Sequence, residues 1–354
     1  MTTAVLLYTM RCNIACAHCS VRSGPDRHGA MTRDQALALV DGIAATPGVR
    51  YIDISGGEPM LHPDDVIAVI RRIKEHGKEV RLTTNGFWAA TPRRAEALLN
   101  RLKEAGLDAV GLSLDKWHLD FLPAGLARNF VDACRAVGFP PLVSCVVRGD
   151  PTDRRDGAPD DLKTLLDYYG LARERATNLQ AWGAHLEQLG EAERAAFLAE
   201  TIRSRLLVNW QYLAGEGRAA EMLRDETVWT PFEQTPDEPC PVAGKMPTID
   251  RHGKLFPCCA PWVNHPDRAF ATVDGNTVGR ELEAMHARPA LAVIRRLGPR
   301  RLMAALMARG YRFSACNSGI CNLCSQMLDA TDLNEMDRAA QDVLAAEGSV
   351  AQIL

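Results

Sequence analysis

The chain has 354 residues, of which 47% are hydrophobic, and its formal net charge is −3. This length and composition supply the core of one large α/β unit with a smaller second domain, and they exclude a disordered chain. The charge excludes the basic surface of a nucleic-acid-binding protein, and no apolar run is long enough to span a membrane. No secretion signal occurs in the first residues, so we expect a cytoplasmic protein.

Short apolar runs alternate with segments of helical periodicity over the first 215 residues or so. Thr32 begins the first predicted helix, with Gln35 three residues later, and Pro47-Gly48 ends it. After an apolar run that begins at Leu6, strands are predicted at 51–55, 80–84, 109–114, 142–147 and 207–213. The helices between them are predicted at 63–76, 92–105, 126–137, 160–171 and 187–204. This alternation predicts βαβ units and a parallel sheet, with functional residues at the C-terminal strand ends.

Three cysteines follow the first apolar run in the order C-x3-C-x2-C: Cys12, Cys16 and Cys19. Thiolates at this spacing suit three corners of an iron–sulfur cube and leave one iron free for a substrate or cofactor. The alternative is a zinc site, which needs a fourth protein ligand. His18 lies between two of the cysteines, where we do not expect it to reach around to such a position.

Polar residues and glycines follow three successive predicted strands. The candidate ligand-binding residues there are Gly56, Gly57 and Glu58, then Asn85, then Ser113 and Asp115. The glycines allow the backbone to approach a ligand closely, and Glu58 offers a carboxylate to a cationic amino group. Taken one at a time, each group is also explained as turn chemistry, a helix cap or a solvated acid.

The loop after Asp115 and the strand after it hold further candidates for catalysis. Because the unperturbed pKa of a histidine lies near neutrality, His118 is a candidate general base or substrate ligand, with Asp120 to orient it or to bind substrate. The alternative is that His118 caps the next helix. Cys145 is a candidate hydrogen-atom donor if its side chain points into the barrel, and otherwise a core residue.

Six of the eleven cysteines lie beyond residue 239. Four of them form two separated pairs, which suits a second cluster on Cys240, Cys258, Cys321 and Cys324, with structural zinc as the alternative. Cys259 could replace Cys258, and Cys316 could join the set. A boundary is expected near 225–238, followed by short strands at 247–250 and 254–256. Helices are expected at 280–309 and 333–346.

The first cysteine loop resembles the C-x3-C-x-Φ-C signature of the radical S-adenosylmethionine (SAM) superfamily, with His18 at the Φ position. Gly56-Gly57-Glu58-Pro59 resembles the GGEP motif of the family, and Thr84-Asn85-Gly86 resembles its T-N-G turn. The resemblance implies a partial (β/α)6 barrel over residues 1–225. It also implies a [4Fe-4S] cluster and SAM, which is cleaved to a 5′-deoxyadenosyl radical. In the family, the acid of the GGEP motif holds the SAM ammonium.

The segment from Cys240 to Cys258 resembles the C-x(9–15)-G-x4-C opening of SPASM and twitch domains. The full SPASM run of cysteines is absent, which points to a smaller α+β twitch-like domain over 226–330 with one auxiliary [4Fe-4S] cluster. Residues 331–354 are then a C-terminal helix. A one-electron reductant, such as flavodoxin or ferredoxin, is an implied partner.

The resemblance leaves the substrate open. We expect dehydrogenation or epimerisation of a small polyol or aminosugar, because the cysteine loop begins at Cys12 and leaves no room for a leader-binding domain ahead of it. The alternative is modification of a ribosomally made peptide by crosslinking or epimerisation. A remote alternative is an iron–sulfur or zinc protein without catalytic activity.

Overall fold

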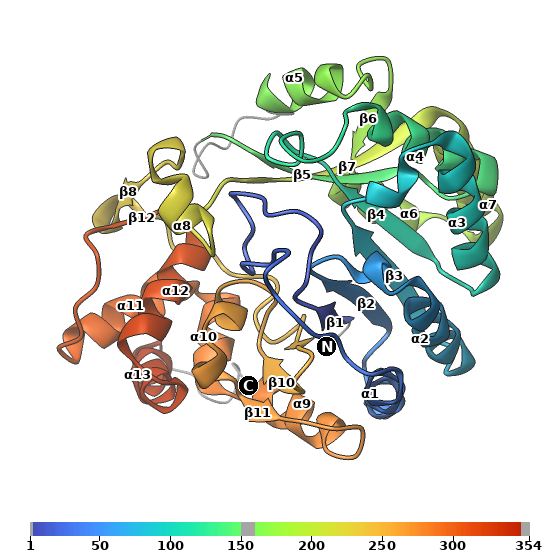
Figure 1. The fold of residues 1–354 in the computed structure, drawn as a ribbon. Coiled ribbons are helices and arrows are strands. Elements are labelled where there is room, and N and C mark those ends of the chain that lie inside the picture. The colour runs from blue at the N-terminus through green and yellow to red at the C-terminus, as the bar shows by residue number, and fades with distance from the viewer. Residues whose placement is uncertain (1–2, 150–159, 348–354) are drawn as a thin grey trace.

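The computed structural model describes residues 3–149 and 160–347 and is built around one twisted sheet (Figure 1). The strands of its parallel part are β1 Thr3–Thr9, β2 Tyr51–Gly56, β3 Glu79–Thr84, β4 Ala109–Ser113, β5 Leu142–Val147, β6 Arg175–Asn178 and β7 Arg205–Tyr212. Most of them are apolar runs buried on both faces, as expected for strands covered by crossover helices.

Helices connect these strands and cover the outer face of the sheet (Figure 1). They are α1 Arg33–Ala45, α2 Pro63–Glu75, α3 Pro92–Glu104, α4 Gly125–Val137, α5 Asp160–Tyr168, α6 Leu179–Gln188 and α7 Glu191–Ser204. Their starts follow local chemistry. The side chain of Thr32 accepts a hydrogen bond from the Gln35 N–H, and that of Thr91 caps α3 in the same way.

The ten strands of the sheet lie in the order β11-β10-β9-β1-β2-β3-β4-β5-β7-β6. Strands β1 to β7 are parallel to their neighbours. The sheet has two open edges, so the barrel is partial, and the predicted (β/α)6 class is confirmed. All C-terminal strand ends of this part meet on one side of the molecule.

Several elements differ from the sequence predictions, and three of them are described here. The edge strand β6 was not predicted, because its four residues are polar or small and two of them are exposed. The helix expected at 187–204 is two helices, which meet around Gly190, the N-cap of α7. The third is the short strand β11, Ala271–Thr272, which sequence patterns also missed.

The C-terminal part continues the same sheet. Strand β9 (Thr248–Ile249) pairs in parallel with β1, and β10 (Lys254–Phe256) folds back antiparallel on β9 through a turn at Gly253, whose φ is +73°. Buried Ile249, Leu255 and Phe256 join the core cluster that also holds the residues of β1. The segments on either side of the predicted boundary are therefore joined by strand pairing and by a common core.

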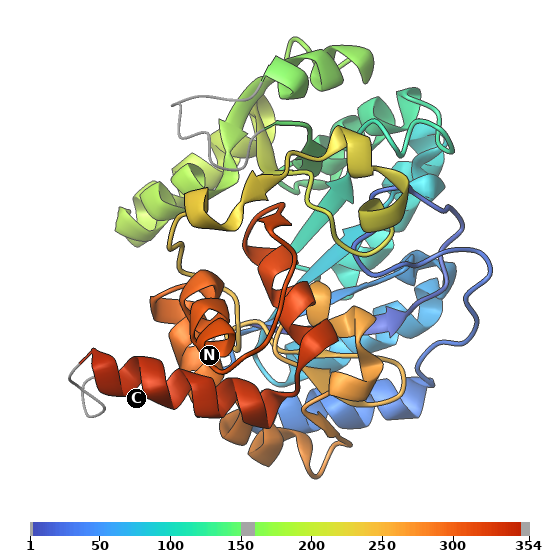
Figure 2. The same ribbon diagram turned by 90° about the vertical axis from the view of Figure 1, so that its left-hand side faces the viewer.

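The remaining elements form a helical group beside the sheet. They are α8 Ala219–Met222, β8 Thr230–Pro231, α9 Val278–His286, α10 Pro289–Arg296, α11 Pro299–Ala308, β12 Cys316–Asn317, α12 Ile320–Ala330 and α13 Leu333–Ala346. Figure 2 shows α13 along the outside of this group, where it packs on α10 and α11. No helix in the described ranges is long and apolar enough to cross a membrane.

Candidate active site

The three N-terminal cysteines lie in the loop that follows β1. All three are free thiols, and Cys12 and Cys16 are buried in a small apolar cluster with Trp117. The loop is fixed by backbone hydrogen bonds such as Cys12 N–H to Gly24 O at 3.0 Å. In addition, the Ser23 N–H donates to Cys19 Sγ at 3.3 Å.

Burial raises the pKa of the Cys12 thiol to about 12, and the negative groups Glu58, Cys16 and Cys19 contribute to the rise. The buried Cys12 thiol therefore resists ionisation unless a cation is present. A metal centre supplies that positive charge, and metal ligation ionises a coordinating thiol. The donor set therefore fits a thiolate-bound iron centre.

Glu58 connects the ends of β2 and β3. One carboxylate oxygen accepts from Thr84 Oγ1 at 2.8 Å and from Met60 N at 2.9 Å, and the other accepts from Asn85 N at 2.7 Å. Glu58 is completely buried, and burial raises its pKa to about 7. Its oxygens thus already have protein donors, so a role in holding the SAM ammonium stays a prediction.

The glycine pair before Glu58 lies against the cysteine loop. A Cβ on Gly57 would lie 2.1 Å from Arg11 O, and one on Gly56, whose φ is +144°, would lie 2.3 Å from Thr9 O. Only glycine permits this approach. The pair therefore brings the end of β2 against the chain that leads to Cys12.

Asn85, at the end of β3, contacts the same loop. Its Nδ2 donates to Asn13 Oδ1 at 2.9 Å and lies 3.6 Å from Cys12 Sγ. Among the strand-end residues proposed from sequence, Asn85 has the most direct contact with a cysteine.

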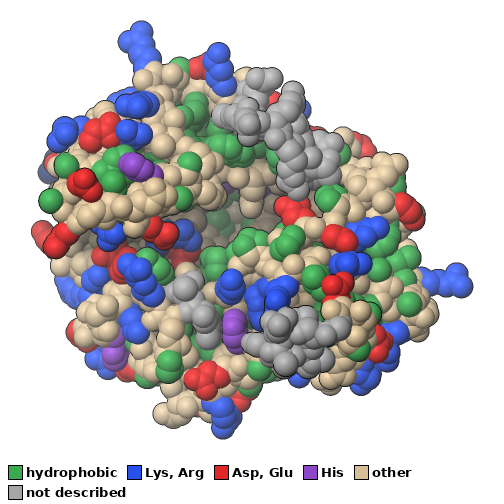
Figure 3. All heavy atoms as spheres, turned by 180° about the vertical axis from the view of Figure 1, so that it is seen from behind, with side chains coloured by type: hydrophobic (Ala, Val, Ile, Leu, Met, Phe, Trp, Pro, Cys, Tyr) green, Lys and Arg blue, Asp and Glu red, His purple; other side chains and the backbone are tan. Residues whose placement is uncertain are grey.

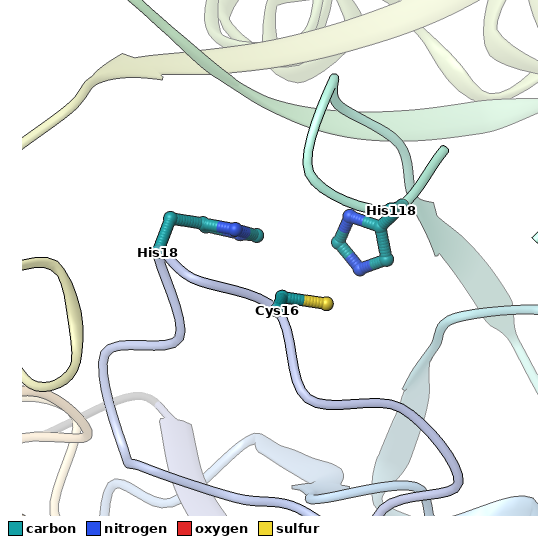
Figure 4. Close-up of side chains that lie close together, drawn as sticks. All are labelled: Cys16, His18 and His118. Carbon is teal, nitrogen blue, oxygen red and sulfur yellow. The ribbon is translucent and has the colours of Figure 1, made fainter. Parts of the chain in front are cut away.

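Asp115 holds two histidines beside the middle cysteine. Its Oδ2 lies 3.0 Å from His18 Nε2, and its Oδ1 lies 2.9 Å from His118 Nδ1. Ligand atoms of Cys16, His18 and His118 lie within 4.8 Å of one another. Figure 4 shows His118 reaching this group from the loop after β4, while Cys16 and His18 belong to the β1–α1 loop.

The electrostatics of this group favour a charged pair. Burial would raise the pKa of Asp115, but the imidazoles of His118 and His18 outweigh it and lower the pKa well below its usual range. Burial would lower the pKa of His118, but Asp115 and then Cys16 raise it to about 10. His118 is thus held beside Asp115 and Cys16, and its role as a general base stays a prediction.

Trp117 completes the wall of the site. It is buried and stacks on His18, with ring centroids 4.9 Å apart. Its Nε1 and the Nδ1 of His18 are buried without a hydrogen-bond partner in the described part of the chain. Unpartnered polar atoms beside the cysteine loop are what a polar cofactor such as SAM would satisfy.

The remaining candidates from sequence are Asp120 and Cys145 for catalysis and Ser113 for cofactor binding. Asp120 is exposed, and Ser113 is half-buried. Cys145 is 2% exposed and belongs to the main core cluster, whereas the next residue, Val146, contacts the cluster around Cys12 and Cys16. Because neighbouring residues of a strand point to opposite faces, this favours a core role for Cys145, and its role as a hydrogen donor stays a prediction. Trp210, opposite Cys145, also packs on the main core.

Sequence reasoning missed Arg218. Its guanidinium donates to Cys16 O at 2.5 Å and to Ser23 O, and its backbone N–H donates to Cys19 O. The neighbouring Gly217 approaches Cys19 and Ser20 so closely that a Cβ would lie 2.4 Å from both carbonyl oxygens. The signal in the sequence that could have indicated Arg218 is the Gly-x-Gly-Arg run at residues 215–218, shortly after β7.

The four C-terminal cysteines proposed as a second ligand set come together. Burial raises the pKa of Cys321 strongly, and Glu216, Cys258 and Cys240 add to the rise. Burial is also the main cause that raises the pKa of Cys324, and the neighbouring thiols of Cys240, Cys321 and Cys258 raise it further.

The two spare cysteines differ in their surroundings. Burial is the main cause that raises the pKa of Cys259. The nearby carboxylate of Asp53, which forms an ion pair with Arg81, raises it further. Cys316 lies on β12, paired with Pro231.

Seen from behind, the molecular surface is hollowed near its centre, and acidic and basic side chains lie around the hollow (Figure 3).

Residues 6–147 match the radical SAM superfamily. Over 331 residues the chain is 19% identical to "Putative peptide biosynthesis protein YydG" of Bacillus subtilis strain 168, which covers 91% of this chain and 90% of that protein. It is also 38% identical over 122 residues to GTP 3′,8-cyclase of Lactiplantibacillus plantarum. That match covers 32% of this chain and spans only about a third (34%) of the cyclase.

Two solved structures give weaker likenesses. Native anSMEcpe with bound AdoMet is 15% identical with a TM-score of 0.48, covering 97% of this chain and all of that chain. BtrN in complex with AdoMet and 2-DOIA is 11% identical with a TM-score of 0.42, covering 84% and 88%. Nothing about the substrate follows from likenesses at this level.

The family match begins in β1, contains the three cysteines, and ends with the last residue of β5. A [4Fe-4S] cluster on cysteines and SAM are the cofactors of that family, and the free thiols and unpartnered polar atoms described above fit both. Residues 6–147 of the chain therefore form a radical SAM domain.

Proposed function

We propose that this protein is a radical SAM enzyme that modifies a peptide. The observation that carries the proposal is the match to the Bacillus subtilis peptide biosynthesis protein, which extends over 91% of the chain and therefore beyond the radical SAM domain. The polyol or aminosugar substrate expected from sequence rested on the early position of Cys12, and that argument fails if leader binding is done by a separate protein.

In this proposal Cys12, Cys16 and Cys19 hold the cluster, which supplies the electron that splits SAM. Asn85 and Arg218 fix the loop from two sides, through contacts to Cys12 and to the carbonyl of Cys16. Trp117, His18 and His118 form an aromatic wall beside Cys16. Holding the reacting atoms close in a dry site is what hydrogen abstraction by a reactive radical requires.

The second centre is proposed on Cys240, Cys258, Cys321 and Cys324. Four thiolates suit either a structural zinc ion or an iron–sulfur cluster. An iron–sulfur cluster there would accept an electron from the substrate radical and favour an oxidation such as a crosslink.

The first test is SAM cleavage. Anaerobically reconstituted protein with dithionite and SAM should form 5′-deoxyadenosine, and Cys16→Ala should abolish it. Zinc without iron in the purified protein, or activity that survives Cys16→Ala, would contradict the cluster assignment.

The second test concerns the substrate. The protein is co-expressed with each short peptide encoded beside its gene, and the peptide is examined by mass spectrometry. A loss of two mass units indicates a crosslink or dehydrogenation. Uptake of one deuterium from D2O indicates epimerisation. Turnover of a polyol or aminosugar, with all neighbouring peptides unchanged, would overturn the peptide proposal.

A further inference from the structure

Glu216 is a buried carboxylate to which the reaction proposed above assigns no role. It is 4% exposed, and neither carboxylate oxygen has a hydrogen-bond partner among residues 3–149 and 160–347. The charged neighbour that acts on it is another acid, Asp329. A buried carboxylate without a cation or donor is unfavourable. Protonation does not remove the problem, because the new O–H also lacks an acceptor.

The backbone places Glu216 beside the C-terminal cysteines. The Gly215 N–H donates to Ser318 Oγ at 2.7 Å, and Asn322 Nδ2 donates to Gly215 O at 2.9 Å. Ser318 and Asn322 flank Cys321 at the start of α12, and Figure 1 shows α8, which follows Glu216, next to α12.

We propose that Glu216 is an oxygen ligand of the C-terminal metal centre and binds iron beside Cys321. The inference rests on the auxiliary iron–sulfur centre proposed above and adds a carboxylate to its thiol donors. The iron supplies the positive charge that the described residues around Glu216 do not. Carboxylate is an established protein ligand for transition metals.

The test uses the full-length chain with Cys12, Cys16 and Cys19 replaced by Ala, so that all bound iron belongs to the C-terminal centre. In this background, Glu216→Gln is compared with the parent. The matched control is Asp329→Asn, because the Asp329 side chain is 70% exposed and is the neighbouring acid. The measurements are iron per chain, the rate of iron loss to EDTA, and the EPR spectrum after reduction by dithionite.

Glu216→Gln is expected to lose iron at least tenfold faster than the parent and to shift the EPR g-values, while Asp329→Asn changes neither. Glu216→Asp should restore part of the retention, since it keeps the carboxylate. Unchanged retention and an unchanged spectrum in Glu216→Gln would overturn the inference alone. A parent that binds no iron would overturn the auxiliary centre itself.

Folding is checked separately, by comparing the far-UV circular dichroism of Glu216→Gln with that of the parent. If that variant does not fold, Glu216→Asp decides, because a carboxylate shortened by one methylene must alter the spectrum of an iron that it binds. An identical spectrum would contradict ligation.

Discussion

Asp115 has the largest number of partners around the N-terminal cysteines. Its two oxygens face His18 and His118, and one of them also accepts from the backbone N–H of Trp117 at 3.1 Å. Tyr169 Oη donates to its backbone carbonyl at 2.8 Å. The residue therefore positions the wall of the site, and its predicted role in binding a ligand stays a prediction.

Asp115→Asn is expected to keep iron at Cys12, Cys16 and Cys19 but to reduce SAM cleavage by more than tenfold. The asparagine side chain can still accept the hydrogen bond from the backbone N–H of Trp117, but it presents an N–H₂ group to one histidine. Breaking a buried charge pair is unfavourable by about 3 kcal/mol. The measurement is 5′-deoxyadenosine formed per cluster. Asp120→Asn is the control, because Asp120 is exposed, and it should be unaffected. A defect in Asp120→Asn of equal size would restore Asp120 as a catalytic candidate.

Glu58 should make stability depend on pH in the direction opposite to an ordinary ion-paired acid. Its folded-state pKa is about 7, against an ordinary value of 4.5, because of burial. Between these two values the folded chain binds more protons than the unfolded chain, so stability falls as pH rises. The advantage of the wild-type chain over Glu58→Gln should therefore shrink by up to about 1.4 kcal/mol per pH unit between pH 4.5 and 7.

Urea unfolding of both reduced apo proteins, at half-unit steps of pH, measures this difference. A constant difference across the range would mean that the hydrogen bonds from Thr84 and Asn85 keep Glu58 ionised throughout.

At the scale of elements, the segment 214–218 connects the two proposed metal centres. Gly215 is bonded to residues at the start of α12, and Arg218 is bonded to the carbonyls of the N-terminal cysteine loop. Asn264 Nδ2, in the C-terminal part, also donates to Ser20 O at 2.6 Å. The cysteine loop is thus held in part by residues some 200 positions away.

Gly217→Ala should release iron from the N-terminal site although it changes no ligand. Its φ is +52°, and the added Cβ would lie 2.4 Å from Cys19 O and Ser20 O, so the loop must move. Gly77→Ala is the matched control, since Gly77 has a similar φ of +67° but nothing within 4 Å of an added Cβ. Iron content and the EPR signal of the SAM-bound cluster measure the effect. Equal loss in both variants would show that backbone strain, and not the contact, is responsible.

The elements that were predicted well from the sequence are those whose structure is determined by the pattern of their own residues. The strand at Leu142–Val147 and the helix at Leu333–Ala346 have the predicted bounds, because each is a strong periodic pattern with a clear start. The polar edge strand β6 was missed because it is held by backbone pairing with β7 and not by its side chains.

The same distinction applies to the site. The cysteine loops and Asn85 were found because their types and spacing are local signals. Glu216 and Arg218 were missed because their roles come from tertiary contacts, such as the bond between Arg218 and Cys16. The surroundings of His118 could not be predicted either, since its pKa depends on Asp115 and Cys16 being brought beside it.

At the scale of the whole molecule, the pairing of β9 with β1 makes the radical SAM part dependent on the C-terminal part. Strand β1 lies between β2 and β9, and it leads directly into the cysteine loop. Removing the C-terminal part would expose the backbone of β1 and the apolar surface that Leu255 and Phe256 cover. Exposed strand edges with apolar faces promote aggregation.

A chain that ends at residue 225 is therefore expected to aggregate or to bind no iron, although it contains every ligand of the first cluster. The full-length double variant Cys321→Ala/Cys324→Ala separates two causes, because it removes ligands of the proposed second centre and keeps β9. It should retain the first cluster, as measured by iron content and by the EPR signal with SAM. A soluble 1–225 chain that cleaves SAM would show that the barrel is an independent domain. Loss of the first cluster in the double variant would show that the second centre, and not the strand pairing, supports it.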